Sequence, residues 1–448
     1  MKTPVLVITA LLAVANAFAQ ANDTLRLSVS DCIDLALENN IPLKNAQLDI
    51  EMAKATRHEA QTAYLPKMSA QALAFDALNP MVSFGIDDID NALVRQTLYN
   101  LFAQYGALMD LDKTYSFAQD GVVLNVMATE ALYAGGRIRN GNRLAQVGVE
   151  AAQHQALIKE DEVRLQTECL YWQIVALEEK VHTLDRLDQL LDTLDKDLDG
   201  AIEAGLAMPT DRYKVTLKKN ESRLNRKKVE NGLTLLKMAL AQYIGTEGKV
   251  LSLTDTLGMM TTPTAYYRNP GEAVAQRHEM RLLDLSVQAE QLKKKMTLGE
   301  ALPSLLVGGS ASYHTLFNDP KPNAMVFAML QVPITDWHKT AYSLKKHRLS
   351  TQAAENTRRD LSEQMRLQTN QAWFNLEQSH LRISMSQDAV DDAQANLKIV
   401  SDYYEAGLVP LSDLLEAQTL LQQSLNELSD SQVDYRINLV KYRQLTNQ

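Results

Sequence analysis

Residues 165–206 read LQTECLYWQIVALEEKVHTLDRLDQLLDTLDKDLDGAIEAGL, and this stretch decides the fold. It contains no proline, and its apolar side chains return every three or four positions, which is coiled-coil spacing with an occasional stutter. The members of this stripe are Leu170, Ile174, Leu177, Val181, Leu184, Leu187, Leu191, Leu194 and Leu198. One helix from about Asn140 to Ala204 would measure roughly 100 Å. A helix of that length cannot wrap one globular core, so it must lie along other long helices.

The same stretch has a counterpart in the second half of the chain. Three pairs of matching segments share an offset of 202, and a fourth pair upstream has an offset of 237, so the first copy carries 35 extra residues. A fixed repeat of this kind predicts a repeated structural unit. The pairs are Leu165-Gln166-Thr167 with Leu367-Gln368-Thr369, Glu203-Ala204-Gly205-Leu206 with Glu405-Ala406-Gly407-Leu408, Thr210-Asp211 with Ser412-Asp413, and Leu65-Pro66 with Leu302-Pro303.

Two segments break the helical spacing and alternate as strands do. In residues 305–317 and 122–129, every second side chain is apolar and most of those between are small or polar. The wall of a membrane barrel requires such a pattern, although the edge of a soluble sheet looks similar at this length. Each repeat therefore reads as helix, strand pair, long helix, glycine turn and helix.

Four strands per chain cannot close into a barrel. Open edges cannot face lipid, because each unpaired N–H or C=O there costs several kcal/mol. If these strands span a bilayer, chains must pool them. Two chains would give eight strands, and three would give twelve and leave a lumen.

Composition and charge restrict the class of protein. The 448 residues carry 45 Lys and Arg against 55 Asp and Glu, a net charge of −10 that argues against nucleic-acid binding. Neither a catalytic motif nor metal-ligand spacing is present among the eight histidines, so we expect no enzyme activity, no cofactor and no metal. Lys2 precedes an apolar run, and Ala17-Phe18-Ala19 is a cleavage site, which predicts a secretory signal peptide.

These patterns divide the chain into four parts. We expect the signal peptide in residues 1–19, the first repeat in 20–245, a linker in 246–268 and the second repeat in 269–448. The extra residues of the first repeat fall within about 74–120.

The ordered motifs resemble the TolC-like outer-membrane efflux channels, or outer membrane factors. The resemblance covers essentially all of the chain after residue 19, and no single motif decides it; their order within a two-fold repeat does. The residues that carry it are Leu37-Glu38-Asn39-Asn40-Ile41-Pro42, Tyr64-Leu65-Pro66, Leu132-Tyr133-Ala134-Gly135-Gly136-Arg137 and the Gly-Leu turns at Gly205 and Gly407.

The resemblance implies a mainly α protein with a membrane β-barrel. The expected assembly is a homotrimer whose twelve strands form a barrel in the outer membrane, in contact with its lipid, and whose helices continue as a coiled-coil tunnel in the periplasm. It implies a passive exit duct for small molecules, which an inner-membrane pump drives through a periplasmic adaptor. The outer component of a type I protein secretion system remains an alternative, as does a periplasmic scaffold without a pore.

Two groups of site residues follow from the resemblance. The adaptor-docking tips are Gly205, Leu206, Gly407 and Leu408, and the periplasmic gate comprises Tyr404, Asp211, Thr210, Asp413 and Glu416. Within the gate, Tyr404 is expected to bond Asp211, whereas the position of a second, arginine link holds Val409. Asp413 and Glu416 lie on one helix face and are expected to form a carboxylate ring. The alternative is a capping box begun by Ser412 or Asp413.

Two further expectations rest on the residues themselves. Folding the chain back near residue 207 places Lys219 opposite Asp195 and Arg226 opposite Asp188, so the basic residues there should pair with the preceding acidic helix. Cys32 and Cys169 are expected to meet an oxidising compartment, where a disulfide is possible but spacing does not fix it.

Overall fold

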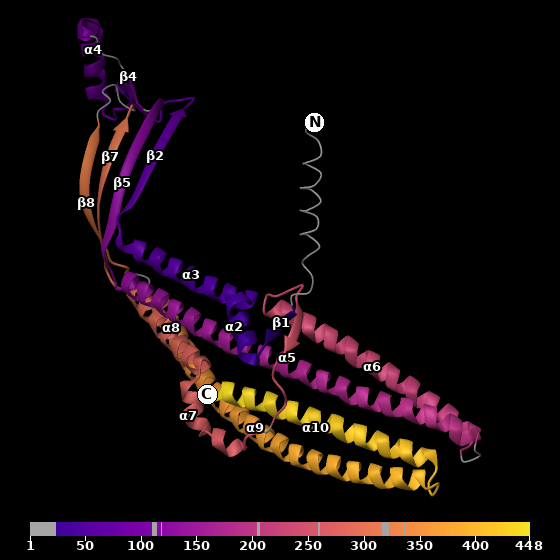
Figure 1. The fold of residues 1–448 in the computed structure, drawn as a ribbon. Helices are drawn as coiled ribbons and strands as arrows, with labels where there is room; N and C mark the ends of the chain where they lie inside the picture. The colour runs from indigo at the N-terminus through magenta and orange to yellow at the C-terminus, as the bar shows by residue number, and fades with distance from the viewer. Residues whose placement is uncertain are drawn as a thin grey trace, which may run out of the picture. The chain divides into compact units, whose positions relative to one another are not determined.

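The computed structural model describes residues 24–109, 114–117, 119–203, 207–258, 260–315, 322–334 and 337–448 (Figure 1). The expected signal peptide lies outside these residues. None of the described helices combines the length and apolarity needed to cross a bilayer. The elements are β1 Thr24–Leu27, α2 Val29–Asn39, α3 Ile41–Gln61, η1 Thr62–Tyr64, β2 Lys67–Asp76, β3 Val82–Gly85, η2 Ile86–Asp88, α4 Ala92–Met109, β4 Thr114–Phe117, β5 Asp120–Ala134, α5 Arg137–Glu203, α6 Pro209–Tyr243, β6 Val250–Leu253, η3 Pro263–Tyr266, α7 Pro270–Gln276, α8 His278–Glu300, β7 Ser304–His314, β8 Asn323–Gln331, α9 Trp337–Glu405 and α10 Leu411–Leu445.

The sequence repeat is also a structural repeat. Helices α6 and α10 both have 35 residues and begin 202 positions apart, at Pro209 and Leu411. Strands β2 and β7 begin 237 positions apart, at Lys67 and Ser304. The 35-residue difference between the two offsets therefore falls between the start of β2 and the start of β5.

The chain forms two compact units whose boundaries fall inside helices. One, the sheet unit, consists of Ala53–Gly148 and Val287–Ala353. The other, the helical unit, consists of Val149–Ser286 and Ala354–Gln448 with the N-terminal segment up to Met52. Each sequence repeat contributes to both units, so the predicted domain limits at residues 245 and 269 describe the repeat and remain predictions.

The sheet unit is built on four antiparallel strands in the order β2-β5-β7-β8 (Figure 1). Strand β5 pairs with β2 from Thr129 to Asp120 and with β7 on its other side. Strands β2 and β8 are the edges of this sheet in the described protomer. The turn from β5 into α5 requires glycine, because Gly135 has a φ of +61° and leaves no room for a Cβ against the backbone of Gly299.

The register brings one set of alternating, almost entirely apolar positions from all four strands to one face of the sheet, which we call the apolar face; Leu73, Val123 and Leu306 lie on the other face. Leu124 is opposite Ala72 on one side and Tyr313 on the other. Glu130 is a charged residue on this face; it lies opposite Val307, just beyond the point where β2 stops pairing with β5. Its members are Met68, Ala70, Ala72, Ala74, Val122, Leu124, Val126, Ala128, Leu305, Val307, Gly309, Ala311, Tyr313, Ala324, Val326, Ala328 and Leu330.

The opposite face, the polar face, carries a different chemistry. Its cross-strand rows include Gln71, Asn125 and Ser312, and one edge row begins at Lys67. Methionine and phenylalanine side chains lie among them, and the Phe327 ring covers Gly308 so closely that a Cβ there would lie 2.7 Å from the ring. The predicted alternation is therefore confirmed, with each strand presenting one apolar and one mixed polar side.

The extra residues of the first repeat form a small appendage between β2 and β5. Strands β3 and β4 pair antiparallel, and α4 lies between them in sequence. Arg95 is the one charged residue of α4, and its guanidinium donates to the Ile89 carbonyl at 3.0 Å. Several apolar side chains of α4, among them Leu93 and Leu101, are exposed.

The helical unit holds one large buried cluster around the middle of α5. Cys32 and Ala36 of α2 pack there with Val163 and Ile174 of α5 and with Leu240 of α6. The short N-terminal helix therefore packs midway along the long helix. Fully burying aliphatic side chains of this size stabilises the fold by about 1.5–3 kcal/mol each.

A buried tyrosine connects the first strand to the linker that follows α6. The Tyr171 hydroxyl donates to Asp255 at 2.7 Å, and the same carboxylate accepts from the Val29 amide at 2.8 Å. Burial, together with the bond to Asp255, raises the pKa of Tyr171. This network holds β1 and β6, which pair in parallel, against α5.

Ion pairs fix the register of α6 against α5. Lys219 Nζ lies 2.9 Å from Asp195 and 2.7 Å from Asp192. Arg226 Nε lies 3.1 Å from Asp188. Both predicted pairs are confirmed, so these cations neutralise a neighbouring helix. Partly exposed pairs of this kind contribute about 0.2–1 kcal/mol each.

The two cysteines are free thiols in the structure. Cys32 is buried, and burial raises its pKa to about 12. The charges that act on Cys169 come from Lys441 and Glu168, whereas those acting on Cys32 come from Asp31 and Asp255. The possible disulfide is therefore not formed.

We expect the native protein to protect Cys32 from alkylation at pH 7.5, because the thiolate is the nucleophile and burial disfavours it. Without reductant, iodoacetamide followed by mass spectrometry should leave Cys32 unmodified in the native protein and modify both cysteines after unfolding. A chain that remains unmodified at both positions after unfolding would carry the disulfide. The Cys169→Ser variant is the control that assigns the signal to Cys32.

Candidate gate and docking site

The loop between α9 and α10 is a tight turn closed by glycine. Gly407 has a φ of +73°, and its amide donates to the Tyr404 carbonyl at 2.9 Å. The Leu408 amide donates to the Tyr403 carbonyl at 2.9 Å, which satisfies another of the last carbonyls of α9. The Leu408 side chain is 71% exposed. The equivalent predicted tip, Gly205 with Leu206, lies outside the described residues.

All four long helices meet in a second buried cluster beside this turn. Leu198 of α5, Val215 of α6 and Leu414 of α10 are buried in it. Tyr404 of α9 packs against it and is half-buried. The structure therefore joins the two helical hairpins at this end, and Tyr404 lies at the junction.

Tyr404 lies close enough to Asp211 for its charge to act on the tyrosine, but the hydrogen bonds and ion pair of Asp211 go to other residues. Burial raises the pKa of Tyr404, and the negative charges of Asp211 and Asp197 raise it further. The Asp211 carboxylate accepts from the Met208 amide at 3.2 Å and lies 2.9 Å from Lys214 Nζ. In this protomer its oxygens therefore cap and neutralise the start of α6.

The remaining gate residues of the first repeat lie in the same first turn. Thr210 is exposed, two residues after the Met208 N-cap. The Arg212 guanidinium pairs with Asp199 of α5, so it is committed within its own hairpin. An arginine link that replaced the missing one at Val409 would have to break this pair.

Asp413 in the first turn of α10 and Glu416 in the second turn are both exposed. The capping-box alternative for them is wrong, since α10 begins at Leu411 with Pro410 as its N-cap and no side chain caps it. Asp413 holds the position that Asp211 holds in α6, but proline has no N–H for its carboxylate to accept. Within the described part of the chain, neither Asp413 nor Glu416 forms an ion pair. Their charges are therefore available to something outside the protomer.

The sequence carried a signal for this difference between the two turns. Pro209 favours the first helical position of α6, which places Asp211 at the third position and its carboxylate over the Met208 amide. Pro410 is one position earlier relative to its helix. A one-residue shift of proline thus decides which acidic side chain is bound locally and which is not.

Comparisons with known proteins agree with this architecture. Residues 269–448 match the family model described as outer membrane efflux protein. The chain is 23% identical over 256 residues to the outer membrane protein TolC of Vibrio cholerae, a match that spans 54% of this chain and 58% of that relative.

Solved structures extend the likeness to nearly the whole chain. VceC of Vibrio cholerae has a TM-score of 0.75 at 14% identity, with 93% of this chain and 95% of that chain covered. The open state of the MtrE channel of Neisseria gonorrhoeae has a TM-score of 0.74 at 15% identity, with 93% and 88% covered. These likenesses establish the fold. The second repeat thus matches the outer membrane efflux protein family, and nearly the whole chain shares the fold of these solved structures.

Proposed function

We propose that this chain is the outer-membrane component of a tripartite export system and serves as a passive exit duct for small molecules. The observation that carries the proposal is the apolar face, which runs across four paired strands. In water such a face would be an exposed apolar surface of 17 residues, whereas in a bilayer it is the wall that lipid requires. The polar face then lines the water-filled lumen.

Three chains complete the duct. Edge strands β2 and β8 each need a partner in lipid, and three protomers would supply twelve strands around a lumen. The helical unit also has a surface that other copies of the chain could cover. Leu367, Phe374 and Leu381 of α9 are exposed at intervals of seven residues, which is an open coiled-coil stripe.

The energy for export comes from elsewhere. A periplasmic adaptor couples the duct to an inner-membrane pump, and no cofactor or catalytic residue is assigned to this chain. The protein-secretion alternative uses the same tube. The scaffold alternative is disfavoured, because a scaffold without a pore has no use for the apolar face.

The duct is tested with purified protein. Unheated samples in detergent should migrate as a trimer that heating dissociates, and the trimer should form conducting channels in planar lipid bilayers. A protein released into the periplasmic wash as a monomer without conductance would overturn the proposal. Export of a protein substrate, but of no small molecule, in a deletion strain carrying this chain would instead select the secretion alternative.

Adaptor docking is assigned to the two turn leucines, Leu206 and Leu408, of which the structure describes Leu408 as exposed. Leu206→Asp combined with Leu408→Asp should abolish export, because two charges replace apolar contacts, while the trimer band on unheated gels stays intact. The matched Leu206→Met and Leu408→Met variant should export normally. Normal export by the aspartate variant would show that docking does not use these residues.

The latch is assigned to Tyr404, whose hydroxyl would reach Asp211 when the trimer closes. Tyr404→Phe keeps the ring that packs against Leu198 and Leu414 and removes the hydroxyl. We expect a higher resting conductance of single trimers in planar bilayers. Tyr403→Phe, at an exposed neighbouring position, is the control and should behave as wild type. Equal resting conductance of the Tyr404 variant and wild type would remove the latch.

The carboxylate ring is assigned to Asp413 and Glu416. Asp413→Asn with Glu416→Gln removes two charges per chain, and neither side chain caps α10, so trimer stability should be unchanged. We expect lower cation selectivity from reversal potentials and weaker block by divalent ions. Asp388→Asn with Asp391→Asn removes the same charge from α9 and should change both much less. Selectivity and block that persist in the first variant would place the ring elsewhere.

A further inference from the structure

Positive charge is concentrated where the helices of the sheet unit meet its strands. The segments 53–67, 137–148, 287–303 and 337–353 hold thirteen Lys and Arg against three Asp and Glu, in a chain whose net charge is −10. We call these cations the basic collar. Its members are Lys54, Arg57, Lys67, Arg137, Arg139, Arg143, Lys293, Lys294, Lys295, Lys339, Lys345, Lys346 and Arg348.

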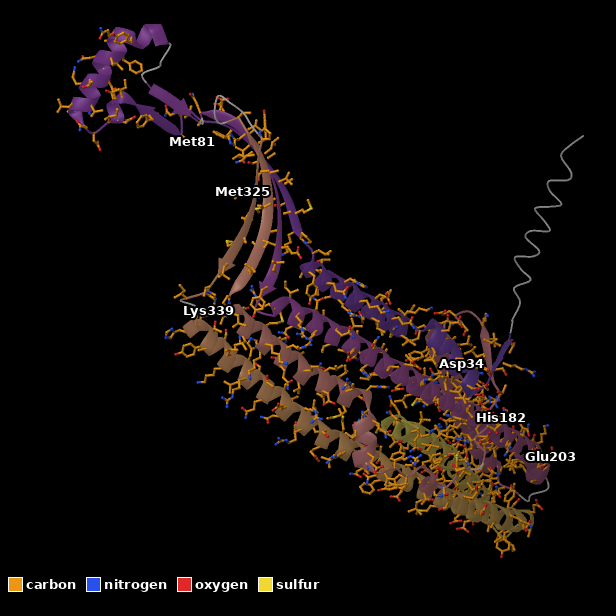
Figure 2. All side chains as sticks on the ribbon, turned by 90° about the vertical axis from the view of Figure 1, so that its left-hand side faces the viewer. Asp34, Met81, His182, Glu203, Met325 and Lys339 are labelled. Carbon is orange, nitrogen blue, oxygen red and sulfur yellow. The ribbon has the colours of Figure 1, made fainter. Side chains whose placement is uncertain are left out.

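The collar adjoins one end of the sheet on all four strands. Lys67 is the first residue of β2, and α5 begins at Arg137, three residues after β5 ends. Strand β7 begins four residues after α8 ends, and α9 begins six residues after β8 ends. Figure 2 shows Lys339 at the end of α9 that is nearest the strands. The charges therefore follow directly on the end of the apolar face.

Most of the collar is exposed and little of it is neutralised. Lys294, Lys295, Lys345 and Lys346 are exposed. Among the ion pairs of the described residues, the collar contributes Lys293 with Glu290, at 2.6 Å. By contrast, Lys219, Arg226 and Lys237 of α6 in the helical unit are paired with acidic side chains of α5. Lys294, Lys295, Lys345 and Lys346 form no ion pair among the described residues, so these clustered charges attract an external anion.

Apolar side chains accompany the collar. Tyr133 of β5 and Ile334, just after β8, are exposed at the same end of the sheet. On α9 a shallow groove of about 500 Å³ is lined by Tyr342, Leu349 and Ala353, with Lys345 and Lys346 beside them. Adjacent apolar and cationic groups match an amphiphile that has an acyl chain and an anionic head.

We infer that the basic collar binds anionic phospholipid headgroups. The lipids belong to the membrane leaflet nearest the end of the sheet where the strands join the helices. This inference rests on the proposed function, which places the apolar face in a bilayer. The headgroup layer on each side of the hydrocarbon is about 5–8 Å thick. Lys345 lies about 12 Å along α9 from the start of the helix, farther than the headgroup layer is thick. Its side chain can extend toward the membrane, and its charge acts over a Debye length of about 8 Å, so it still reaches the lipid phosphates. The lipid phosphates supply the missing counter-ions.

The test uses the purified trimer in nanodiscs of phosphatidylcholine mixed with phosphatidylglycerol, and native mass spectrometry counts the retained lipids. Wild type should retain phosphatidylglycerol preferentially at low salt and lose the preference at about 0.5 M salt. The variant Lys294→Gln, Lys295→Gln, Lys345→Gln and Lys346→Gln should lose at least about tenfold of that preference. The matched control, Arg223→Gln, Lys227→Gln, Lys228→Gln and Lys398→Gln, removes the same charge outside the collar and should keep it.

Three outcomes would overturn the inference. The first is a wild type that shows no headgroup preference, and the second is a collar variant that retains the full preference. The third is a variant that keeps its lipid preference but no longer cosediments with purified peptidoglycan, which would assign the collar to the cell wall. Conductance of the same samples in planar bilayers distinguishes failure of the lipid inference from failure of the proposed channel function. A trimer that conducts but shows no lipid preference would refute the lipid inference and leave the channel function standing.

Discussion

The structure depends on one constraint, the need of every backbone N–H and C=O in hydrocarbon for a partner. The sheet of this protomer is apolar on one face across four strands, yet β2 and β8 leave both edges without a partner in the chain. Such a sheet is stable in a bilayer only when closed, and four strands are too few for closure. The protomer is therefore a segment of a wall, and this requirement determines the oligomer that the helices must accommodate.

The helices accommodate an oligomer because they are long and because one of them leaves a row of apolar side chains exposed. In the helical unit, α5 buries a continuous row of apolar side chains against α2, α6 and β6, and salt bridges to Lys219 and Arg226 set the register of its hairpin. The seven-residue stripe of α9 beginning at Leu367 stays exposed. One set of contacts is thus complete within the chain and the other is left for neighbouring copies.

Charged side chains likewise fall into two groups, those paired within the protomer and those with no ion pair among the described residues. Lys219 and Arg226 of α6 pair with acidic side chains of α5, whereas Lys294, Lys295, Lys345 and Lys346 of the basic collar are exposed on helices that adjoin the sheet. At the turn between α9 and α10, Asp413 and Glu416 form no ion pair among the described residues, while Asp211 at the position equivalent to Asp413 is bound by Met208 and Lys214. Groups that the protomer leaves unsatisfied mark the surfaces at which we place its partners.

The sequence by itself determined the periodic features, because a stripe of leucines or an alternation of apolar residues fixes which element forms and which face it buries. It fixed the repeat, the long helices, the alternating strands and the pairing of Lys219 with Asp195. The capping alternative that it left open for Asp413 is wrong, since Pro410 occupies the N-cap and offers no N–H. Only the tertiary structure decided the strand order, the separation of Cys32 from Cys169, and the partners of Asp211. These depend on which elements meet in space, and contacts between residues far apart in the chain leave no local pattern from which to read them.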